Sequence, residues 1–232
     1  MQRPVSYLAW AALVFLGVAV IARADTLTLA DGRELAATVT GIATGSITTA
    51  QAGALPVEQV RSLRFARPDV IPYPSGVWLT DGTLLCGVLR DLKTNAVTVR
   101  SVTLGEIGIP LERVAVIYFE TPPIPSTLAV PASGLVRAVF KNGGFKEGRL
   151  LAVSAGHVLL RVDSGLEKLP IDNLACLVRA MPAATAEVTL RNGDRLAHVT
   201  WDGNRGTADA GAGPVTLKFE QVREIVFGKT GQ

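Results

Sequence analysis

One eleven-residue pattern occurs four times in this chain and constrains its fold more than any other feature. The copies read LPVEQVRSLRF, IPLERVAVIYF, LPIDNLACLVR and LKFEQVREIVF, and they begin at Leu55, Ile109, Leu169 and Leu217. Apolar residues recur at matching positions, and the fourth residue is always acidic. Such repetition indicates a protein built from small successive units rather than around one large core.

A second pattern precedes each copy and predicts a tight hairpin. It places Asp-Gly or Asn-Gly between apolar stretches, with the glycines at Gly32, Gly82, Gly143 and Gly193. These dipeptides accept positive φ at both centres of a type I′ turn, which is a strong local hairpin signal. Further strands are predicted in the middle of the units, over residues 45–53, 94–102, 156–165 and 205–213.

The eleven-residue pattern itself predicts a short strand, a single 3₁₀ turn and a closing strand. In the first copy these elements are expected at residues 55–57, 58–60 and 61–65. The acidic residues are expected to cap free backbone N–H groups of the turn. Metal binding is not expected of them, because they lie far apart in sequence and no other ligands accompany them. These residues are Glu58, Glu112, Asp172 and Glu220.

The predicted fold class is all-β, with four tandem units arranged as two pairs. The units are expected at residues 25–66, 75–120, 134–180 and 185–228, and they are numbered 1 to 4 in that order. Residues 121–133 contain four prolines and no charged residue. Such a segment favours an extended, semi-rigid linker, which we expect to separate the two pairs.

Residues 1–24 have the pattern of a secretory signal peptide. Arg3 is followed by an uncharged run over residues 7–21, and Ala22-Arg23-Ala24 supplies small residues for cleavage after Ala24. Export is therefore expected, to a periplasmic or an extracellular location. The alternative is an uncleaved membrane anchor, for which the run is shorter than the roughly 20 residues that a span needs.

Cleavage would lower the formal net charge from +3 to +1, because Arg3 and Arg23 are lost with no acidic residue. The remaining Lys and Arg are scattered along the chain. Proteins that bind phosphate backbones usually carry a clustered basic face, so nucleic acid is not an expected partner.

Unit 2 carries two motifs that recur together in a known family. The first has apolar residues and glycines at Val77, Leu79, Gly82, Leu85, Gly87, Leu89 and Leu92, and the second is the strand–turn–strand ending at residues 109–119. On these residues unit 2 resembles an Sm-like small barrel, and the wider SH3-like group, including PRC-type barrels, shares the ending. The resemblance implies four small SH3-like or Sm-like barrel-type repeats. It does not carry the RNA site, because Lys93 stands in place of the family's Asp and Glu112-Arg113 in place of its Arg-Gly.

The sequence contains no recognisable catalytic, cofactor-binding or metal-binding motif. His157 and His198 are the only histidines, they fall in different units, and neither has a metal-ligand spacing. Two glycine-rich stretches within residues 203–213 are interpreted as loops, because no helix follows to hold a phosphate. We therefore predict no enzyme activity, no cofactor and no metal.

Two cysteines and two tryptophans lie in the predicted units. Whether Cys86 and Cys176 form a disulfide is left open, although an exported protein permits one. Trp78 is expected to cover a junction with the neighbouring unit. If instead Trp78 and Trp201 were both exposed, a polysaccharide ligand would be indicated.

Together these features predict an exported, non-catalytic structural or protein-interaction module of the bacterial envelope. Its partner would be another protein or a second copy, bound through surface complementarity and strand-edge pairing. One alternative is an Sm-like nucleic-acid-binding protein held by an uncleaved anchor. Another is a module that binds cell-wall polysaccharide. Membrane contact is expected only through residues 1–24, if they are retained.

Overall fold

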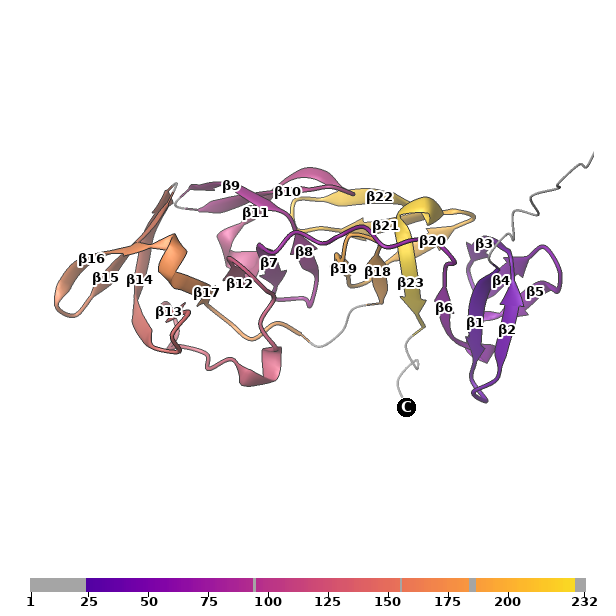
Figure 1. Ribbon diagram of the computed structural model, residues 1–232. Helices are drawn as coiled ribbons and strands as arrows, with labels where there is room; N and C mark the ends of the chain where they lie inside the picture. The colour runs from indigo at the N-terminus through magenta and orange to yellow at the C-terminus, as the bar shows by residue number, and fades with distance from the viewer. Residues whose placement is uncertain (1–23, 94, 155, 184–186, 228–232) are drawn as a thin grey trace, which may run out of the picture.

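The computed structural model describes residues 24–93, 95–154, 156–183 and 187–227, and this part of the chain is all-β (Figure 1). The predicted fold class is therefore confirmed. The predicted signal segment lies outside the described residues except for Ala24. Across the described ranges, no helix has the length and apolar character needed to cross a membrane.

The same order of elements recurs in all four units: a hairpin, a three-stranded meander, a 3₁₀ turn and a closing strand. Unit 1 contains β1 (Asp25–Leu29), β2 (Glu34–Ala37), β3 (Val39–Ala43), β4 (Ser46–Thr49), β5 (Gly53–Pro56), the 3₁₀ turn η1 (Val57–Gln59) and β6 (Val60–Arg64). Unit 2 contains β7 (Gly76–Leu79), β8 (Leu84–Cys86), β9 (Val88–Lys93), β10 (Ala96–Ser101), β11 (Gly105–Pro110), η2 (Leu111–Arg113) and β12 (Val114–Tyr118).

In unit 3 the second hairpin strand continues without a break into the meander. Its elements are β13 (Val136–Phe140), β14 (Phe145–Ser154), β15 (His157–Val162), β16 (Gly165–Pro170), η4 (Ile171–Asn173) and β17 (Leu174–Val178). Unit 4 contains β18 (Val188–Leu190), β19 (Arg195–Leu196), β20 (Thr200–Asp202), β21 (Arg205–Asp209), β22 (Pro214–Lys218), η5 (Phe219–Gln221) and β23 (Val222–Val226). One further turn, η3 (Pro125–Thr127), lies in the linker.

Strand pairing follows one scheme in every unit. The first strand pairs with the second strand on one side and with the closing strand on the other, as β1 does with β2 and β6. The middle strands form the meander, as β3, β4 and β5 do. Among the described strands, no pairing closes these sheets into a barrel.

The hairpin turns differ in type from the prediction. Gly32 has φ of 87°, but the residue before it does not have positive φ. The Gly32 N–H donates to the Leu29 carbonyl at 3.0 Å, and the Leu29 N–H donates to the Arg33 carbonyl at 2.8 Å. These bonds define a type I turn closed by a glycine bulge, not a type I′ turn. The Asp31 carboxylate stabilises this form by accepting the Arg33 N–H at 3.0 Å. The same backbone bonds recur at Gly82, Gly143 and Gly193.

The eleven-residue endings fold into the predicted strand, 3₁₀ turn and closing strand, displaced by one residue in unit 1. The predicted capping role of the acidic residues is wrong. Glu58 is the second residue of η1 and is exposed, and no side chain caps that turn. Pro56 holds the cap position of this turn, and Glu58 follows it by two residues, too late to act as the cap. The other acidic residues also hold the second position of their turns: Glu112, Asp172 and Glu220.

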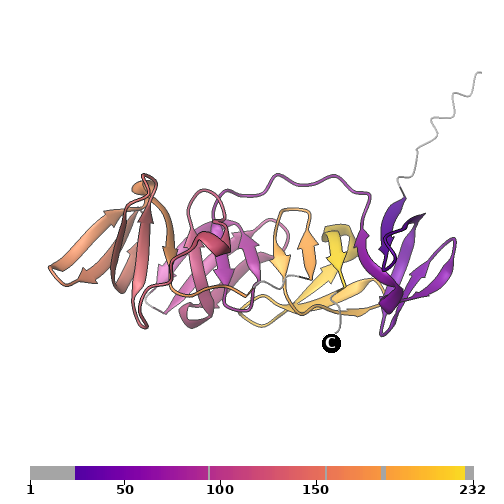
Figure 2. The same ribbon diagram turned by 90° about the horizontal axis from the view of Figure 1, so that it is seen from below.

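The units are not arranged in chain order. Closing strand β6 of unit 1 pairs with β23 of unit 4, and β12 of unit 2 pairs with β17 of unit 3. Strands β8 and β19 join unit 2 to unit 4. The result is an elongated row in the order 1–4–2–3 (Figures 1 and 2).

The prediction that residues 121–133 separate two pairs of sequence neighbours is therefore wrong. This linker joins units 2 and 3, whose closing strands are hydrogen-bonded to each other. A free closing strand exposes unpaired N–H and C=O groups. The linker is long enough for the chain to turn back, so that the next unit satisfies those groups.

The linker between units 1 and 2 runs along unit 4 as an extended strap (Figure 2). The Val70 N–H donates to the Arg191 carbonyl at 2.8 Å, and the Arg191 side chain donates to the Pro68 carbonyl at 2.6 Å. The linker after unit 3 contacts unit 2 in the matching way, since the Ala183 N–H donates to the Thr80 carbonyl at 3.1 Å. Thr80 and Arg191 both stand two residues before the turn glycine. Units 1 and 2 therefore alternate with units 4 and 3 along the row, and the linker of each pair contacts a unit of the other pair.

Candidate functional site

The two closing-strand junctions bring equivalent residues of the repeated pattern face to face. Leu63 lies opposite Ile225 in the unit 1–4 junction, and Ile117 lies opposite Leu177 in the unit 2–3 junction. Each is the ninth residue of its copy, and all four are buried. A contact in which the same patch serves both partners is isologous, as in a two-fold dimer.

Backbone hydrogen bonds flank each of these central residue pairs, and each of the two units donates one of them. In the unit 1–4 junction the Phe65 N–H donates to the Arg223 carbonyl at 2.8 Å, and the Phe227 N–H to the Arg61 carbonyl at 3.0 Å. In the unit 2–3 junction the Phe119 N–H donates to the Ala175 carbonyl at 3.0 Å, and the Arg179 N–H to the Ala115 carbonyl at 2.7 Å. The repeated ending is therefore an assembly surface as well as the last strand of its own unit.

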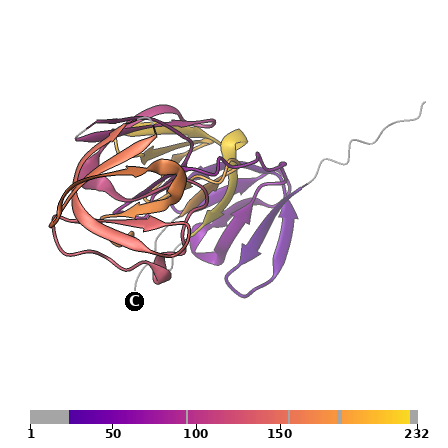
Figure 3. The same cartoon turned by 60° about the vertical axis from the view of Figure 1, so that its left-hand side comes forward.

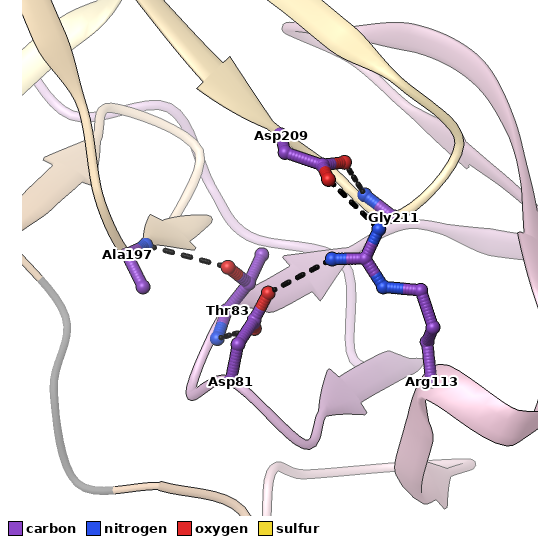
Figure 4. Close-up of polar contacts among 6 residues, drawn as sticks. All are labelled: Asp81, Thr83, Arg113, Ala197, Asp209 and Gly211. Atoms are coloured by element: carbon purple, nitrogen blue, oxygen red, sulfur yellow. Dashed lines mark hydrogen bonds and ion pairs between the residues drawn. The ribbon is translucent and has the colours of Figure 1, made fainter.

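The junction between units 2 and 4 is reciprocal too, but side chains make its distinctive bonds. Asp194 Oδ1 accepts the Cys86 N–H at 2.6 Å, and Thr83 Oγ1 accepts the Ala197 N–H at 3.3 Å. Asp194 and Thr83 each follow the turn glycine of their unit directly. Figure 4 shows the Thr83 half of this exchange.

Asp194 is the centre of a buried polar network. Its second carboxylate oxygen accepts the Ser101 hydroxyl at 2.7 Å and the Asn192 side-chain amide at 2.9 Å. Asp194, Asn192 and Ser101 are all buried. Within the described part of the chain, Asp194 forms no ion pair with Lys, Arg or His. A buried charge without a counter-ion is costly, so the three donors must offset its desolvation.

Burial raises the pKa of the Asp194 carboxyl to about 6, and the bonds from Asn192, Ser101 and the Cys86 backbone act in the opposite direction. The group therefore changes charge near pH 6, well above the range of an exposed carboxyl. It joins β10 and β8 of unit 2 to the β18–β19 turn of unit 4.

Arg113 forms a second bridge between the same units (Figure 4). Its guanidinium donates to Asp209 of unit 4 at 2.8 Å and to Asp81 of unit 2 at 3.2 Å. The hydrogen bond from Arg113 lowers the pKa of Asp209, and the same bond raises the pKa of Arg113. The Arg113 side chain is 33% exposed, so solvent weakens this bridge.

The glycine-rich stretch after β21 is a loop, as predicted, and it packs on unit 2. The loop interpretation is wrong for Arg205 and Gly206, which belong to β21. Gly211 has φ of 98°, and a Cβ there would lie 3.0 Å from Leu79 Cδ1 and 3.1 Å from Ile109 Cγ2. The Asp209 carboxylate also accepts the Gly211 N–H at 2.8 Å. Glycine is needed here both for its backbone conformation and for close approach.

Cys86 and Cys176 are free thiols, and both are buried. They share one apolar cluster with Trp78 and Tyr118 between units 2 and 3. The Tyr118 hydroxyl donates to Cys86 Sγ at 3.3 Å. Burial raises the pKa of each thiol to about 11, which keeps both protonated and unreactive.

The tryptophans are not a surface platform. Trp78 is 7% exposed, and its indole N–H donates to the Gly82 carbonyl at 3.2 Å. Its predicted place at a junction between units is confirmed. Trp201 is half-buried against Phe219, with ring centroids 5.2 Å apart. The paired exposure that a polysaccharide site required is not found.

A groove of about 370 Å³ opens between units 1 and 4. Buried Val39 and Phe219 contribute to its lining. Its charged lining residues are Arg67, Arg205, Lys218 and Glu220, with Thr40 and Asn204 beside them. Among the ion pairs of the described residues, none involves the three cations. The groove therefore has unneutralised positive charge.

The histidines are not brought together. His157 lies in β15 of unit 3, and exposed His198 lies in unit 4, where its Nδ1 is 3.9 Å from Glu187. The described ranges contain no group of three His, Cys, Asp or Glu residues able to hold a metal ion.

Asp194 and the bridging role of Arg113 were missed by sequence reasoning. One signal was present: Asp194 is the only acidic residue that directly follows a turn glycine, where the other units have Arg33, Thr83 and Gly144. A charged residue next to a hairpin turn is normally exposed. Its burial depends on another unit, which no local pattern reveals.

Comparisons with known proteins give no assignment. Neither the models of known protein families nor the curated proteins match this chain.

Proposed function

We propose that this chain is an exported, non-catalytic β-repeat protein that serves as a structural and protein-interaction module of the bacterial envelope. The observation that carries this proposal is the reciprocal pairing of equivalent closing strands. An ending used four times as an assembly surface suits a protein whose task is to hold a shape. We further infer that the four units are SH3-like or Sm-like barrel-type repeats, supported by their common strand order.

The perturbed polar groups support a structural role. Asp194 and Arg113 both lie where units 2 and 4 meet, and their bonds join one unit to the other. The raised pKa of Asp194 is therefore a consequence of its burial between these two units. A perturbed pKa alone would otherwise suggest catalysis.

The groove between units 1 and 4 is the best candidate for partner binding. Arg67, Arg205 and Lys218 supply charge, and Val39 and Phe219 supply apolar contact. This combination suits an acidic, partly apolar segment of another exported protein. Charge complementarity of this kind raises association rates and selects partners.

Site-specific photo-crosslinking at Thr40 in intact cells would test this role. We expect one discrete protein adduct, abolished by Arg205→Glu with Lys218→Glu. The matched control is Lys168→Glu on unit 3, an exposed lysine outside the groove. Adducts to polysaccharide or nucleic acid, or a protein adduct unaffected by charge reversal, would contradict the proposal.

Export is tested separately by the intact mass of the native protein from cell fractions. A mass starting at Asp25 in a soluble envelope fraction supports export. A full-length mass in the membrane fraction would instead make residues 7–21 an anchor and restore the nucleic-acid alternative.

A further inference from the structure

The strand edge that joins units 2 and 4 has counterparts at both ends of the molecule. In that junction Leu84 of β8 lies opposite Arg195 of β19, and each is the second residue after its turn glycine. The corresponding residues of the end units are Glu34 in β2 and Phe145 in β14. Strand β2 pairs only with β1, and residues 145–148 of β14 pair only with β13, among the described strands. Each end unit therefore presents a free edge.

Phe145 is the residue that makes the free edge of unit 3 unusual. It is 57% exposed, whereas Leu84, at the matching position in unit 2, is 4% exposed. The Arg137 guanidinium lies 4.4 Å from the centroid of the Phe145 ring and leaves the rest of the ring open. An exposed aromatic on an unpaired strand is a recognised site of pairing with another chain. Unit 3 lies at one end of the row, where such an edge is accessible (Figure 3).

The charges of the two edges decide which pairing is possible. Two β2 strands centred on Glu34 would place like charges directly opposite each other. A β2 edge on a β14 edge would place Arg33 opposite Lys146, which is again unfavourable. Two β14 strands centred on Phe145 place ring opposite ring and Lys146 opposite Gly144. Only this last pairing is free of opposed like charges.

We propose that the protein forms a two-fold dimer through antiparallel pairing of β14 with β14 of a second copy, centred on Phe145. This inference rests on the proposed interaction role and names one partner for it. The arrangement repeats between chains the isologous contact that β8 and β19 make within the chain. Aromatic residues in directly opposed positions add favourable contact to the backbone bonds.

The dimer differs from the internal junction in one respect. Thr83 and Asp194 each accept a backbone N–H from the facing unit, but the corresponding residue of unit 3 is Gly144, which has no side chain. The contact is also short. A small interface of this kind gives weak, concentration-dependent association.

Sedimentation equilibrium of the full chain measures the association. We expect a monomer–dimer equilibrium that Phe145→Asp weakens at least tenfold and Phe145→Leu largely retains. Glu34→Lys, at the matching position of unit 1, should leave it unchanged.

Cysteine substitution tests the register. Directly opposed residues have Cα atoms about 4.5 to 5.5 Å apart, which suits a disulfide. Under mild oxidation Phe145→Cys should form a covalent dimer, and Glu34→Cys should not. Cys86 and Cys176 are buried and should not interfere.

A wild-type protein that stays monomeric at all concentrations, with equal cross-linking of both cysteine variants, would overturn the dimer. Circular dichroism of each variant shows whether a loss of association is only a loss of folding. The groove experiment is independent of this result, because Thr40 and Phe145 lie in different end units. If no dimer forms, the groove experiment still tests the proposed interaction role by itself.

Discussion

The closing-strand junctions and the β8–β19 junction both join two units, but they do so with different chemistry. Both place equivalent residues of two units in reciprocal contact. The closing-strand junctions have buried apolar centres, such as Leu63 against Ile225. The β8–β19 junction instead depends on the Asp194 carboxylate and the Thr83 hydroxyl.

The difference shows how units of similar structure can be joined in one fixed order. Apolar strand edges stabilise any pairing of similar units, because burial of apolar area is not directional. A buried carboxylate tolerates only a partner that presents donors to it. We infer that the apolar junctions supply most of the stability, and that Asp194 selects unit 2 as the neighbour of unit 4.

The largest expected effect is at an apolar centre. Ile117→Ala removes buried methyl groups and leaves a cavity, which should cost about 2–5 kcal/mol in free energy of unfolding. Urea denaturation measures the loss. Val226→Ala, on an exposed closing-strand residue, is the control and should change stability little. Equal effects of the two substitutions would show that a residue at the junction centre contributes no more to stability than an exposed one.

The next effect is a pH dependence set by Asp194. Its folded-state pKa of about 6 lies above the ordinary value of 3.8, so between these pH values the folded protein retains a proton that the unfolded chain releases. The stabilisation of the folded state by this retained proton is fully present below pH 4 and is lost as the pH rises through 6.

Denaturant unfolding of wild type and Asp194→Asn from pH 4 to 7 measures this loss. The wild type should lose about 3 kcal/mol relative to the variant across that range. Asp209 has a lowered pKa, so its contribution is lost only as the pH falls below about 4, outside this window. Parallel stability curves would show that Asp194 is not the buried titrating group.

Gly211→Ala should have a moderate effect on the contact between units 2 and 4. Positive φ and close contact with Leu79 together should cost about 1–3 kcal/mol. Gly108→Ala is a matched control, because a Cβ there meets no atom within 4 Å and its φ is not positive. Thermal unfolding compares the two. If both variants melt alike, the loop does not need to approach unit 2 closely.

Arg113→Ala should have the smallest effect. Partly exposed ion pairs contribute about 0.2–1 kcal/mol, and salt screens them. The stability difference from wild type should therefore shrink between low and high ionic strength. A larger, salt-independent loss would mean that Arg113 matters mainly by packing.

Sequence reasoning found the local elements because their causes are local. The turn glycines and the eleven-residue endings carry their own backbone preferences, so the hairpins, 3₁₀ turns and closing strands were predictable. The turn type was predicted wrongly because the Asp31 side chain stabilises the bulged form. The order of the units was predicted wrongly because every closing strand has a similar edge. We infer that linker reach and Asp194 decide which edges meet. The burial of Asp194 by another unit is not visible as a local pattern.

The central claim is that unit 1 pairs with unit 4 and not with its neighbour in sequence. Arg64 lies opposite Glu224 in the β6–β23 junction. The double variant Arg64→Cys with Glu224→Cys should form an intramolecular disulfide under mild oxidation, identified by peptide mass mapping. The variant Arg64→Cys with Val116→Cys, which places the second cysteine at the matching position of unit 2, should not link. A disulfide in the second variant and none in the first would contradict the interleaved order.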